Sequence, residues 1–299
     1  MIELKELQLL TALARHQHFA KAAAECGMSQ PAFSMRIRNL EDRLGLSIVR
    51  RANRFQGLTE EGLMIVRRGR SILDDARALE QEIAASRGEV TGTLVLGVIP
   101  TATAWAAQLV DQVRQRYPRI LTQLEATTSL AIQQRLYDGT IDAGITYADS
   151  MGRDLVTVRP LYDESYVLLA PEAMVAGRDG SITWAEAAEL PLSLLNQQMQ
   201  NRRILDRIFA DLGCKPEIVS ESNGFMASMV LALEGSAAAI LPRALTQALG
   251  KLGGTCVLDL VEPEQNRQIC LATLDRSPEL TTIQALKSVV ATFVEGDAT

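Results

Sequence analysis

The chain has 299 residues, 47% of them hydrophobic, so it is long enough for two or three domains and is not globally disordered. No run reaches the roughly 20 apolar residues of a membrane-spanning helix, and the N-terminus lacks the order of a signal peptide, so we expect a cytoplasmic protein. The net charge of −6 is uneven: residues 1–88 hold 14 Lys and Arg against 11 Asp and Glu, and the remainder holds 16 against 25. A basic end on an acidic chain is typical of a nucleic-acid-binding module attached to another domain.

Three helices are predicted at the N-terminus. Four leucines at near-helical spacing predict an amphipathic helix over residues 3–15, and the segment FAKAAAEC predicts a short helix that ends at Gly27. Ser29 is a favourable N-cap, with Pro31 in the first turn of a third helix that ends at Gly45. Helix, short helix, glycine turn and longer helix is the order of a helix-turn-helix.

The third helix has one apolar stripe and one polar, basic face. The stripe consists of Phe33, Ile37, Leu40 and Leu44. With that stripe turned inward, the opposite face is suited to DNA, because amides and guanidinium groups pair with base edges and phosphates. The candidate contacts on this face are Gln30, Pro31, Ser34, Met35 and Arg38, and Arg36 is a further candidate for a phosphate or guanine contact, depending on how the helix lies on DNA. A merely solvated face is the alternative interpretation of such a segment taken alone.

Two short strands around a basic turn are predicted in the segment LSIVRRANRFQGLT. Arg51 and Arg54 lie near the tip of that turn. A helix-turn-helix followed by such a hairpin is a winged helix-turn-helix, and both arginines are candidate DNA contacts.

A long helix is predicted from Thr59 to residue 87, with Thr59 as N-cap and two glutamates at the positive end of the helix dipole. Apolar and small residues then recur in steps of four and three, as in a coiled-coil seam. The seam consists of Ile65, Gly69, Ile72, Ala76, Leu79 and Ile83. We expect a homodimer through this seam, with Gly69 and Ala76 allowing a partner helix to approach closely; packing within one subunit is the alternative.

After a linker at residues 88–92, short apolar strands alternate with helices. This alternation predicts parallel sheet with right-handed crossovers, and two similar blocks of about a hundred residues predict two lobes with a cleft between them. We expect the last helix, residues 278–295, to return to the first lobe.

Enzymatic chemistry has little support in the sequence. Both histidines, His16 and His18, lie in the DNA-binding part, and no Walker, GxSxG or GxGxxG run follows a strand. The four cysteines are widely spaced and form no CxxC pair, so no metal or cofactor is predicted. Small residues in or near a core are the favoured interpretation of these cysteines, and a redox sensor at Cys214 is the alternative.

Taken together, these stretches resemble the LysR-type transcriptional regulators over essentially the whole chain. The family pattern of A-A, S-Q-x-A-x-S, I-x-x-L-E-x-x-L-G and L-T-x-x-G is matched at residues 22–23, 29–34, 37–45 and 58–62. Family members often carry arginine where this chain has Met35, which bears on base preference, and Ile48–Val49 replaces the usual Leu-Phe. The segments TTSLAIQQRLYDGTIDAGITY and MQNRRILD are also similar to regulators associated with formate dehydrogenase genes.

This resemblance implies an all-α winged helix-turn-helix with a long linker helix, followed by an α/β two-lobed effector domain resembling periplasmic solute-binding proteins. The predicted parts are a DNA-binding domain at 1–58, a dimerisation helix at 59–88 and an effector domain at 89–299, with lobe I at about 92–161 and 267–295 and lobe II at about 162–266. The implied partners are promoter DNA, a small-molecule effector, further copies of the chain in a dimer or tetramer, and RNA polymerase. The alternative is a cytosolic solute-binding or enzymatic α/β protein with an accessory DNA-binding module.

The effector site is predicted at the carboxyl ends of the strands, where helix N-termini meet in open α/β lobes. Hydroxyls, backbone N–H groups and an arginine suit a small carboxylate or oxyanion. The candidate residues are Thr101, Thr103, Thr128, Ser129, Asn201, Arg202 and Phe225, with Arg203 as an alternative to Arg202. Simple helix capping is the competing interpretation of each hydroxyl.

Overall fold

The fold of the chain is given by a computed structural model, which describes residues 1–51, 55–152, 156–178, 180–275 and 277–297. These residues form two compact units. The first unit contains residues 1–90 and a short segment that ends at residue 281, and the second contains residues 91–275 and the chain from residue 282 onward. Within the described residues, no helix is both long and apolar enough to cross a membrane.

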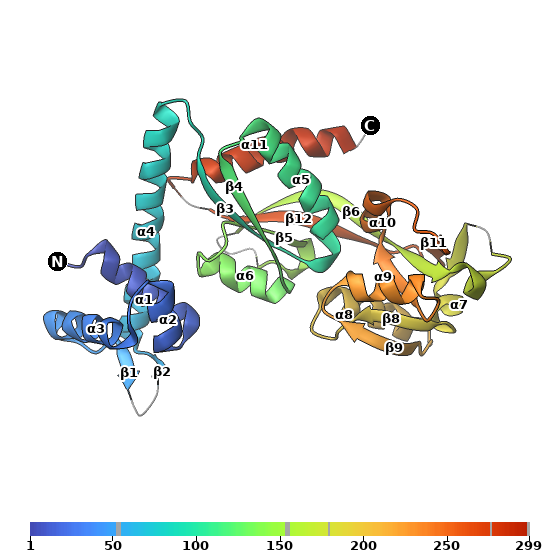
Figure 1. The fold of residues 1–299 in the computed structure, drawn as a ribbon, viewed down its shortest axis with the longest axis horizontal. Coiled ribbons are helices and arrows are strands. Elements are labelled where there is room, and N and C mark those ends of the chain that lie inside the picture. The colour runs from blue at the N-terminus through green and yellow to red at the C-terminus, as the bar shows by residue number, and fades with distance from the viewer. Residues whose placement is uncertain (52–54, 153–155, 179, 276, 298–299) are drawn as a thin grey trace. The chain divides into compact units, whose positions relative to one another are not determined.

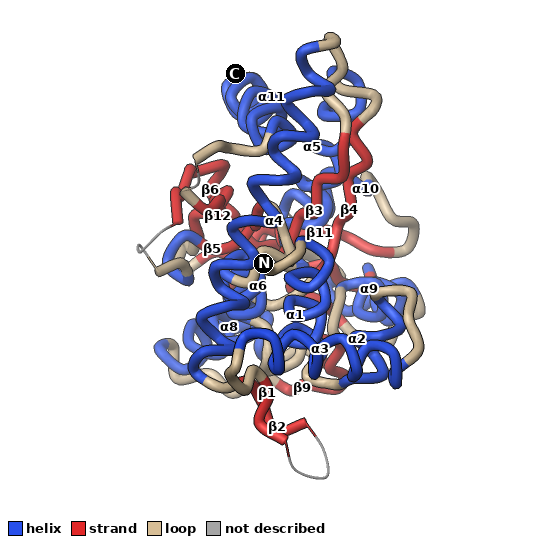
Figure 2. The backbone as a smooth tube through the Cα atoms, turned by 90° about the vertical axis from the view of Figure 1, so that its left-hand side faces the viewer, coloured by secondary structure: helices blue, strands red, loops and turns tan. Residues whose placement is uncertain are grey.

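The first unit is a winged helix-turn-helix with one long helix. Ser29 caps α3 by accepting a hydrogen bond from the Ala32 N–H, and Gly45 ends that helix with a φ of 67°. Strands β1 and β2 form a hairpin that projects from the helices (Figure 2). The elements are α1 (Leu4–His16), α2 (Phe19–Glu25), α3 (Gln30–Leu44), β1 (Val49–Arg51), β2 (Phe55–Leu58) and α4 (Glu60–Ser86).

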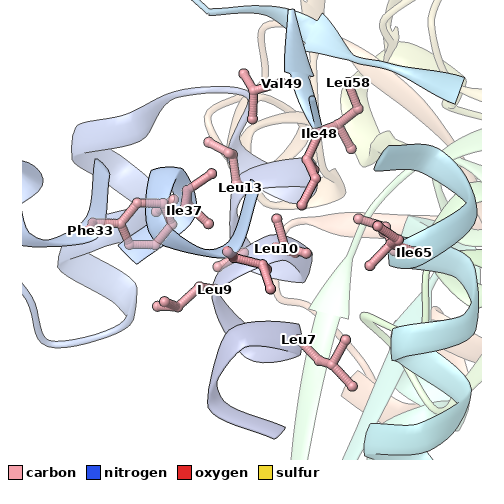
Figure 3. Close-up of a cluster of buried hydrophobic side chains, with 14 of the residues drawn as sticks. Leu7, Leu9, Leu10, Leu13, Phe33, Ile37, Ile48, Val49, Leu58 and Ile65 are labelled. Carbon is pink, nitrogen blue, oxygen red and sulfur yellow. The ribbon is translucent and has the colours of Figure 1, made fainter. Parts of the chain in front are cut away.

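The core of this unit gathers side chains from α1, α3, the hairpin and α4. Figure 3 shows the labelled side chains directed toward one another, from Leu7 on α1 to Ile65 on α4. Phe33 of the predicted stripe is fully buried and packs edge-to-face on Phe19, with ring centroids 6.1 Å apart. Burial of this stripe fixes the opposite face of α3 toward solvent.

The second unit has two lobes built on strands and helices in alternation (Figure 1). Its first elements are β3 (Gly92–Val98), η1 (Pro100–Ala102), α5 (Thr103–Arg116), β4 (Ile120–Ala126), α6 (Ser129–Tyr137), β5 (Ala143–Tyr147), η2 (Ala148–Ser150), β6 (Val156–Pro171), η3 (Glu172–Val175) and β7 (Ser181–Thr183). The remaining elements are α7 (Trp184–Ala188), β8 (Pro191–Leu195), α8 (Gln200–Asp211), β9 (Glu217–Ser222), α9 (Phe225–Leu233), β10 (Ala238–Pro242), α10 (Arg243–Leu249), β11 (Thr255–Val261), β12 (Asn266–Leu274) and α11 (Thr281–Asp297).

The prediction of parallel sheet holds for three strands in each lobe. Strands β4, β3 and β5 are parallel, and so are β10, β8 and β9. Between these groups run antiparallel pairs that the sequence interpretation missed, because β12 pairs with both β5 and β6, and β6 pairs with β10 and β11. The 16-residue strand β6 therefore passes from one lobe into the other, with residues 156–165 on β12 and residues 166–171 on β10 and β11.

Helix α11 packs on the first lobe, as predicted. The Phe293 ring lies 5.2 Å from the Trp105 ring of α5, and the hydroxyls of Ser288 and Tyr117 lie 3.1 Å apart. The C-terminal helix thus packs on the lobe that contains β3, the first strand of the second unit.

Candidate nucleic-acid interface and ligand pocket

The outer face of α3 is open to solvent in the first unit. Five of the six predicted contacts are exposed and Ser34 is partly buried; the exposed five are Gln30, Pro31, Met35, Arg36 and Arg38. Met35 is 61% exposed, which places an apolar thioether where it can meet only apolar surface such as a thymine methyl. All six predicted residues therefore lie outside the buried stripe of α3, with Arg36 on the other flank of that stripe from Ser34 and Arg38.

The arginines of this region divide into two kinds. Arg43 donates to both carboxylate oxygens of Glu6 at 2.6 Å, and this bond keeps the pKa of Glu6 below its ordinary value. Arg36, Arg38 and Arg50 make no ion pair with any described residue. Those three guanidinium groups are available for phosphates or bases.

Arg50 was not among the predicted contacts, although it is exposed on β1 next to the buried Val49. Side chains alternate between the two faces of a strand, so an inward Val49 implies an outward Arg50. That alternation is the sequence signal that could have identified Arg50 as a contact. Arg51 was predicted as a wing contact and its backbone belongs to β1, but its side chain, like the whole of Arg54, lies outside the described residues.

The hairpin of β1 and β2, which is the wing, is held on α3 and α4 by polar contacts. The contacts come from Glu41 and Thr59, two residues of the sequence pattern described above. The Glu41 carboxylate accepts hydrogen bonds from the N–H groups of Ile48 and Val49 at 2.8 and 3.0 Å. The Thr59 hydroxyl donates to the Ser47 carbonyl at 2.7 Å and accepts from the Gly62 N–H at 3.0 Å. These contacts hold the basic strand β1 in a fixed position beside the recognition face.

The predicted seam of α4 is divided along its length. Ile65 is buried, and a Cβ on Gly69 would lie 2.9 Å from the Leu7 side chain, so this half packs on α1 of the same chain. The prediction that Gly69 accommodates a partner helix is therefore wrong, because Leu7 already occupies that space. Farther along, Ala76 is partly buried, and the three large residues stay about half exposed: Ile72, Leu79 and Ile83.

A small pocket opens in the second unit where three strand-to-helix turns meet. It is narrow, since the centre of a water-sized sphere has only about 10 Å³ of space within it. The lining residues are Ile99, Pro100, Thr101, Thr128, Ser129, Tyr147, Met199, Gln200 and Asn201. The set contains four predicted site residues, one or more from each of the turns that begin η1, α6 and α8.

The pocket has hydrogen-bond donors and acceptors that no group of the described residues satisfies. The Ser129 hydroxyl and both side-chain atoms of the Asn201 amide are buried without a hydrogen-bond partner among the described residues. Thr128 is engaged as the cap of α6, accepting from the Ala131 N–H at 3.2 Å. The start of α8 has no side-chain cap, so its first N–H groups face the pocket end of the helix without a side-chain acceptor. Buried polar groups nearly always have a hydrogen-bond partner in proteins, so these atoms can bond to a ligand or to water.

A buried carboxyl lies behind the pocket wall. The Thr101 and Tyr147 hydroxyls are 3.3 Å apart, and the Tyr147 hydroxyl donates to the Glu164 carboxylate at 2.9 Å. Burial raises the pKa of Glu164 from 4.5 to about 7, although hydroxyls around it, first that of Tyr147, oppose the change. Neither Tyr147, the last residue of β5, nor Glu164, within β6, was predicted, because sequence alone does not reveal which polar residues of a strand become buried.

Three predicted pocket residues do not line the pocket. Thr103 is exposed, and its hydroxyl donates to the Ile99 carbonyl at 3.4 Å. Phe225 belongs to the buried apolar cluster of the second lobe. Arg202 is 3% exposed, and its donors are used within the lobe by Asp206, Glu221 and the Leu195 carbonyl. The prediction of Arg202 as an anion clamp is therefore corrected: two carboxylates already neutralise it.

None of the four cysteines lines this pocket, and all four are free thiols. Burial raises the pKa of the Cys270 thiol to about 12, and burial also raises the pKa values of Cys26 and Cys256. Among the described residues, no three His, Cys, Asp or Glu side chains gather as a metal site would require.

Two regions match known protein families. Residues 4–63 match the family described as bacterial regulatory helix-turn-helix protein, lysR family, and residues 87–294 match the LysR substrate binding domain. A probable hydrogen peroxide-inducible genes activator of Streptomyces viridosporus is 32% identical over 273 residues, which cover 90% of this chain and 87% of that protein. The DNA-binding transcriptional dual regulator OxyR of Escherichia coli is 26% identical over 99% of this chain and 97% of its own length.

Solved structures share the fold. A full-length OxyR variant from Pseudomonas aeruginosa has a TM-score of 0.74 at 24% identity and covers 97% of this chain and 95% of its own. Full-length CbnR complexed with its target DNA has a TM-score of 0.66 at 20% identity and covers 97% of this chain and 99% of its own. The arrangement of a winged helix, long helix and two-lobed domain is therefore common to this chain and to full-length regulators.

Proposed function

Because the chain belongs to the LysR family of DNA-binding transcriptional regulators, we propose that it acts at promoters as a homo-oligomer switched by a small anionic effector. The observation that carries the DNA-binding part is the exposed face of α3, where arginines without an ion-pair partner among the described residues flank Gln30 and Ser34. Such a chain works where promoter DNA lies, in the cytoplasm, and RNA polymerase is the partner through which it changes transcription.

We assign base reading to the start of α3 and phosphate contacts to the arginines. Gln30 can pair with adenine, and Arg36, Arg38 and Arg50 can each neutralise a phosphate. The test is fluorescence anisotropy with the DNA upstream of the protein's own gene and with a random duplex of equal length. Arg36→Ala should weaken binding to both duplexes and lower the salt slope by about one. Gln115→Ala, an exposed glutamine of α5, is the control that should change neither. Equal affinity of the wild-type protein for both duplexes at every salt concentration contradicts the proposal.

The exposed half of the α4 stripe is assigned to self-association. Ile72, Leu79 and Ile83 recur in steps of seven and four, so they lie along one line of the helix. Leu79→Glu should dissociate the dimer in sedimentation velocity, because a carboxylate in an apolar seam is costly. Leu63→Glu is the matched control, since Leu63 is also exposed on α4 but lies on the opposite side of the helix. A dimer that survives Leu79→Glu contradicts the assignment.

A tetramer requires a second surface, for which the second unit offers exposed leucines. Leu121 and Leu124 of the edge strand β4 and Leu130 of α6 are 60%, 38% and 70% exposed. Apolar groups on an edge strand are typical of an interface. We propose that dimers formed through α4 pair through this surface, so Leu130→Glu should convert tetramers into dimers in the same sedimentation experiment. Tetramers that persist contradict this step.

The effector is assigned to the pocket at the starts of η1, α6 and α8. The buried, unpartnered Ser129 hydroxyl and Asn201 amide supply hydrogen bonds, and helix N-termini favour negative charge. Arg202 is neutralised within its own lobe, so no free cation is assigned to the anion. The Ser129 hydroxyl, the Asn201 amide and the N-termini of the helices hold it instead. A thermal-shift screen of small carboxylates and oxyanions tests this, with Ser129→Ala as the variant expected to lose the response. The similarity to regulators of formate dehydrogenase genes makes formate the first anion to include.

Peroxide is the other effector to consider, because several relatives are named as activators of hydrogen peroxide-inducible genes. Peroxide acts on proteins chiefly through thiolates. The pocket has no thiol in its lining, and burial raises the pKa values of three of the four cysteines. We therefore expect hydrogen peroxide to leave operator binding unchanged in the anisotropy assay, and a loss or gain that disappears in Cys214→Ser would identify Cys214 as a sensor instead.

A further inference from the structure

We propose that Glu164, through Tyr147 and Thr101, determines the charge of the ligand that the pocket accepts, so that a small monocarboxylate binds together with one proton. This inference rests on the effector pocket assigned above. It adds a specificity-determining residue that does not itself line the pocket.

The three side chains form a continuous chain from the pocket into the interior. Thr101, at the start of η1, and Tyr147, at the end of β5, both line the pocket. Their hydroxyls lie 3.3 Å apart, and the Tyr147 hydroxyl lies 2.9 Å from Glu164 Oε1. All three residues are at least 98% buried, so water does not compete with these hydrogen bonds.

The direction of the hydrogen bonds depends on the charge of Glu164. When Glu164 is ionised it can only accept, so Tyr147 donates to it and the Thr101 hydroxyl donates to Tyr147. The Thr101 oxygen then presents lone pairs to the pocket, which suits a ligand that donates. When Glu164 is protonated it can donate to the Tyr147 oxygen, and both hydroxyl hydrogens turn toward the pocket, which suits a carboxylate. Protonation also removes a negative charge that would repel an anion in this low-dielectric site.

The surroundings of Glu164 allow it to hold a proton near neutral pH. Tyr162 and Tyr166 stand two residues away on the same face of β6, and Arg267 is its cross-strand neighbour on β12. Arg243 of α10 is paired with Asp259 and donates to Ser165, on the other face of β6. Glu164 Oε2 accepts no hydrogen bond from the described residues, so the carboxyl has room for the proton. Burial is the dominant effect on its pKa, which lies at about 7.

The proton balance makes the proposal measurable. Below the pKa of Glu164 the proton is already present, and the affinity for a carboxylate should not depend on pH. Above that pKa the proton is taken from the buffer and bound to the Glu164 carboxyl, so the affinity should fall about tenfold for each pH unit. A neutral ligand of the same shape should show no such fall.

Isothermal titration calorimetry with acetate, between about pH 5.5 and 8.5 and in two buffers of different ionisation enthalpy, gives the number of protons bound. Acetamide is the neutral probe. The full-length wild-type protein should bind acetate at pH 5.5, and near pH 8 it should take up close to one proton per acetate. Glu164→Gln is neutral at every pH, so its acetate affinity should be independent of pH and its proton uptake should vanish.

Two further variants separate the relay from general damage to the fold. Tyr147→Phe breaks the chain of hydroxyls and should reduce the pH dependence of acetate binding to the part that comes from charge repulsion by Glu164. Tyr162→Phe is the matched control, because its hydroxyl is also near enough to Glu164 to feel its charge, has no hydrogen-bond partner among the described residues and does not line the pocket. This variant should keep one proton per acetate. If Glu164→Gln does not fold, proton uptake by the wild-type protein decides the question alone.

The proposal is overturned if acetate does not bind at pH 5.5, if the wild-type protein binds acetate near pH 8 without proton uptake, or if Glu164→Gln keeps that uptake. None of these results bears on DNA recognition, which is measured separately by anisotropy without acetate. Loss of promoter binding with intact proton-linked acetate binding would instead contradict the proposed function and leave the relay in place.

Discussion

Replacing Gly62 with alanine should loosen the wing from α4, although alanine is the better helix former. A Cβ at position 62 would lie 2.3 Å from the Ile48 carbonyl oxygen and 3.1 Å from its carbonyl carbon. The obstacle is backbone, and that same oxygen accepts the Thr59 N–H at 2.9 Å, so it cannot move without losing a contact. Overpacking of this kind costs up to about 3 kcal/mol, and the helix propensity gain returns about 1 kcal/mol. We expect a net loss of about 2 kcal/mol from the first unit.

Gly69→Ala is the matched control on the same helix. Its Cβ would lie 2.9 Å from Leu7 Cδ2, the end of a flexible side chain, and at ordinary van der Waals distances of 3.5 Å from Leu7 Cβ and Cγ, so only that terminal methyl group must give way. A strain of about 1 kcal/mol then offsets the propensity gain, and the stability should stay within about 0.5 kcal/mol of wild type.

Hydrogen exchange of the full chain, followed in peptides from residues 47–70, measures the effect on the first unit directly. Tryptophan fluorescence is an internal reference, because Trp105 and Trp184 both lie in the second unit. The unfolding of that unit should be the same in the wild-type protein and in both variants. Equal protection of Gly62→Ala and wild type, or an equal loss in Gly69→Ala, would refute the steric argument.

Three further predictions concern function. Gln30→Ala and Ser34→Ala should each weaken operator binding by about 1–3 kcal/mol in anisotropy while leaving random DNA unaffected, and unchanged operator affinity in both would contradict the assigned face. Leu79→Glu should also reduce operator affinity, because two half-sites can no longer be held by one dimer; full affinity at low protein concentration would contradict this. Ser129→Ala should lower effector affinity about tenfold in calorimetry, whereas Thr103→Ala, whose exposed hydroxyl donates to the Ile99 carbonyl outside the pocket lining, should not.

The elements that sequence predicted well depend on interactions a few residues apart. Ser29 and Gly45 mark the ends of α3 because a cap bonds three residues ahead and a glycine accepts a left-handed φ. The antiparallel course of β12 was missed because its partners on β6 and β5 lie about 110 and 125 residues earlier in the chain, and nothing local in Asn266–Leu274 selects them. Long-range pairing is decided by packing, which periodicity does not encode.

The same distinction separates the site residues that were found from those that were missed. Thr101, Ser129 and Asn201 follow strands and begin helices, so a topological rule placed them at one edge of the sheets. Arg202 obeyed the same rule, yet Asp206 and Glu221 neutralise it, and only the folded chain brings Glu221 to it. Glu164 lies in the polar-looking run YDES, which gave no sign that its carboxyl is buried.

That buried carboxyl makes the stability of the second unit depend on pH in an unusual direction. Its pKa of about 7 in the folded chain exceeds its ordinary value of 4.5, so between these values the folded state binds more protons than the unfolded state. Stability should therefore be highest below about pH 4.5 for this group, fall as the pH rises toward 7, and be constant above, for a total of about 3 kcal/mol. Glu186 acts in the opposite sense, since Arg178 lowers its pKa to about 2, but its effect is confined below pH 4.5. Urea unfolding followed by tryptophan fluorescence between about pH 5 and 8 should thus show decreasing stability in the wild-type protein and a flatter profile in Glu164→Gln. Parallel profiles for the two proteins would mean that Glu164 stays ionised in the folded chain, and with it the proton relay would fail.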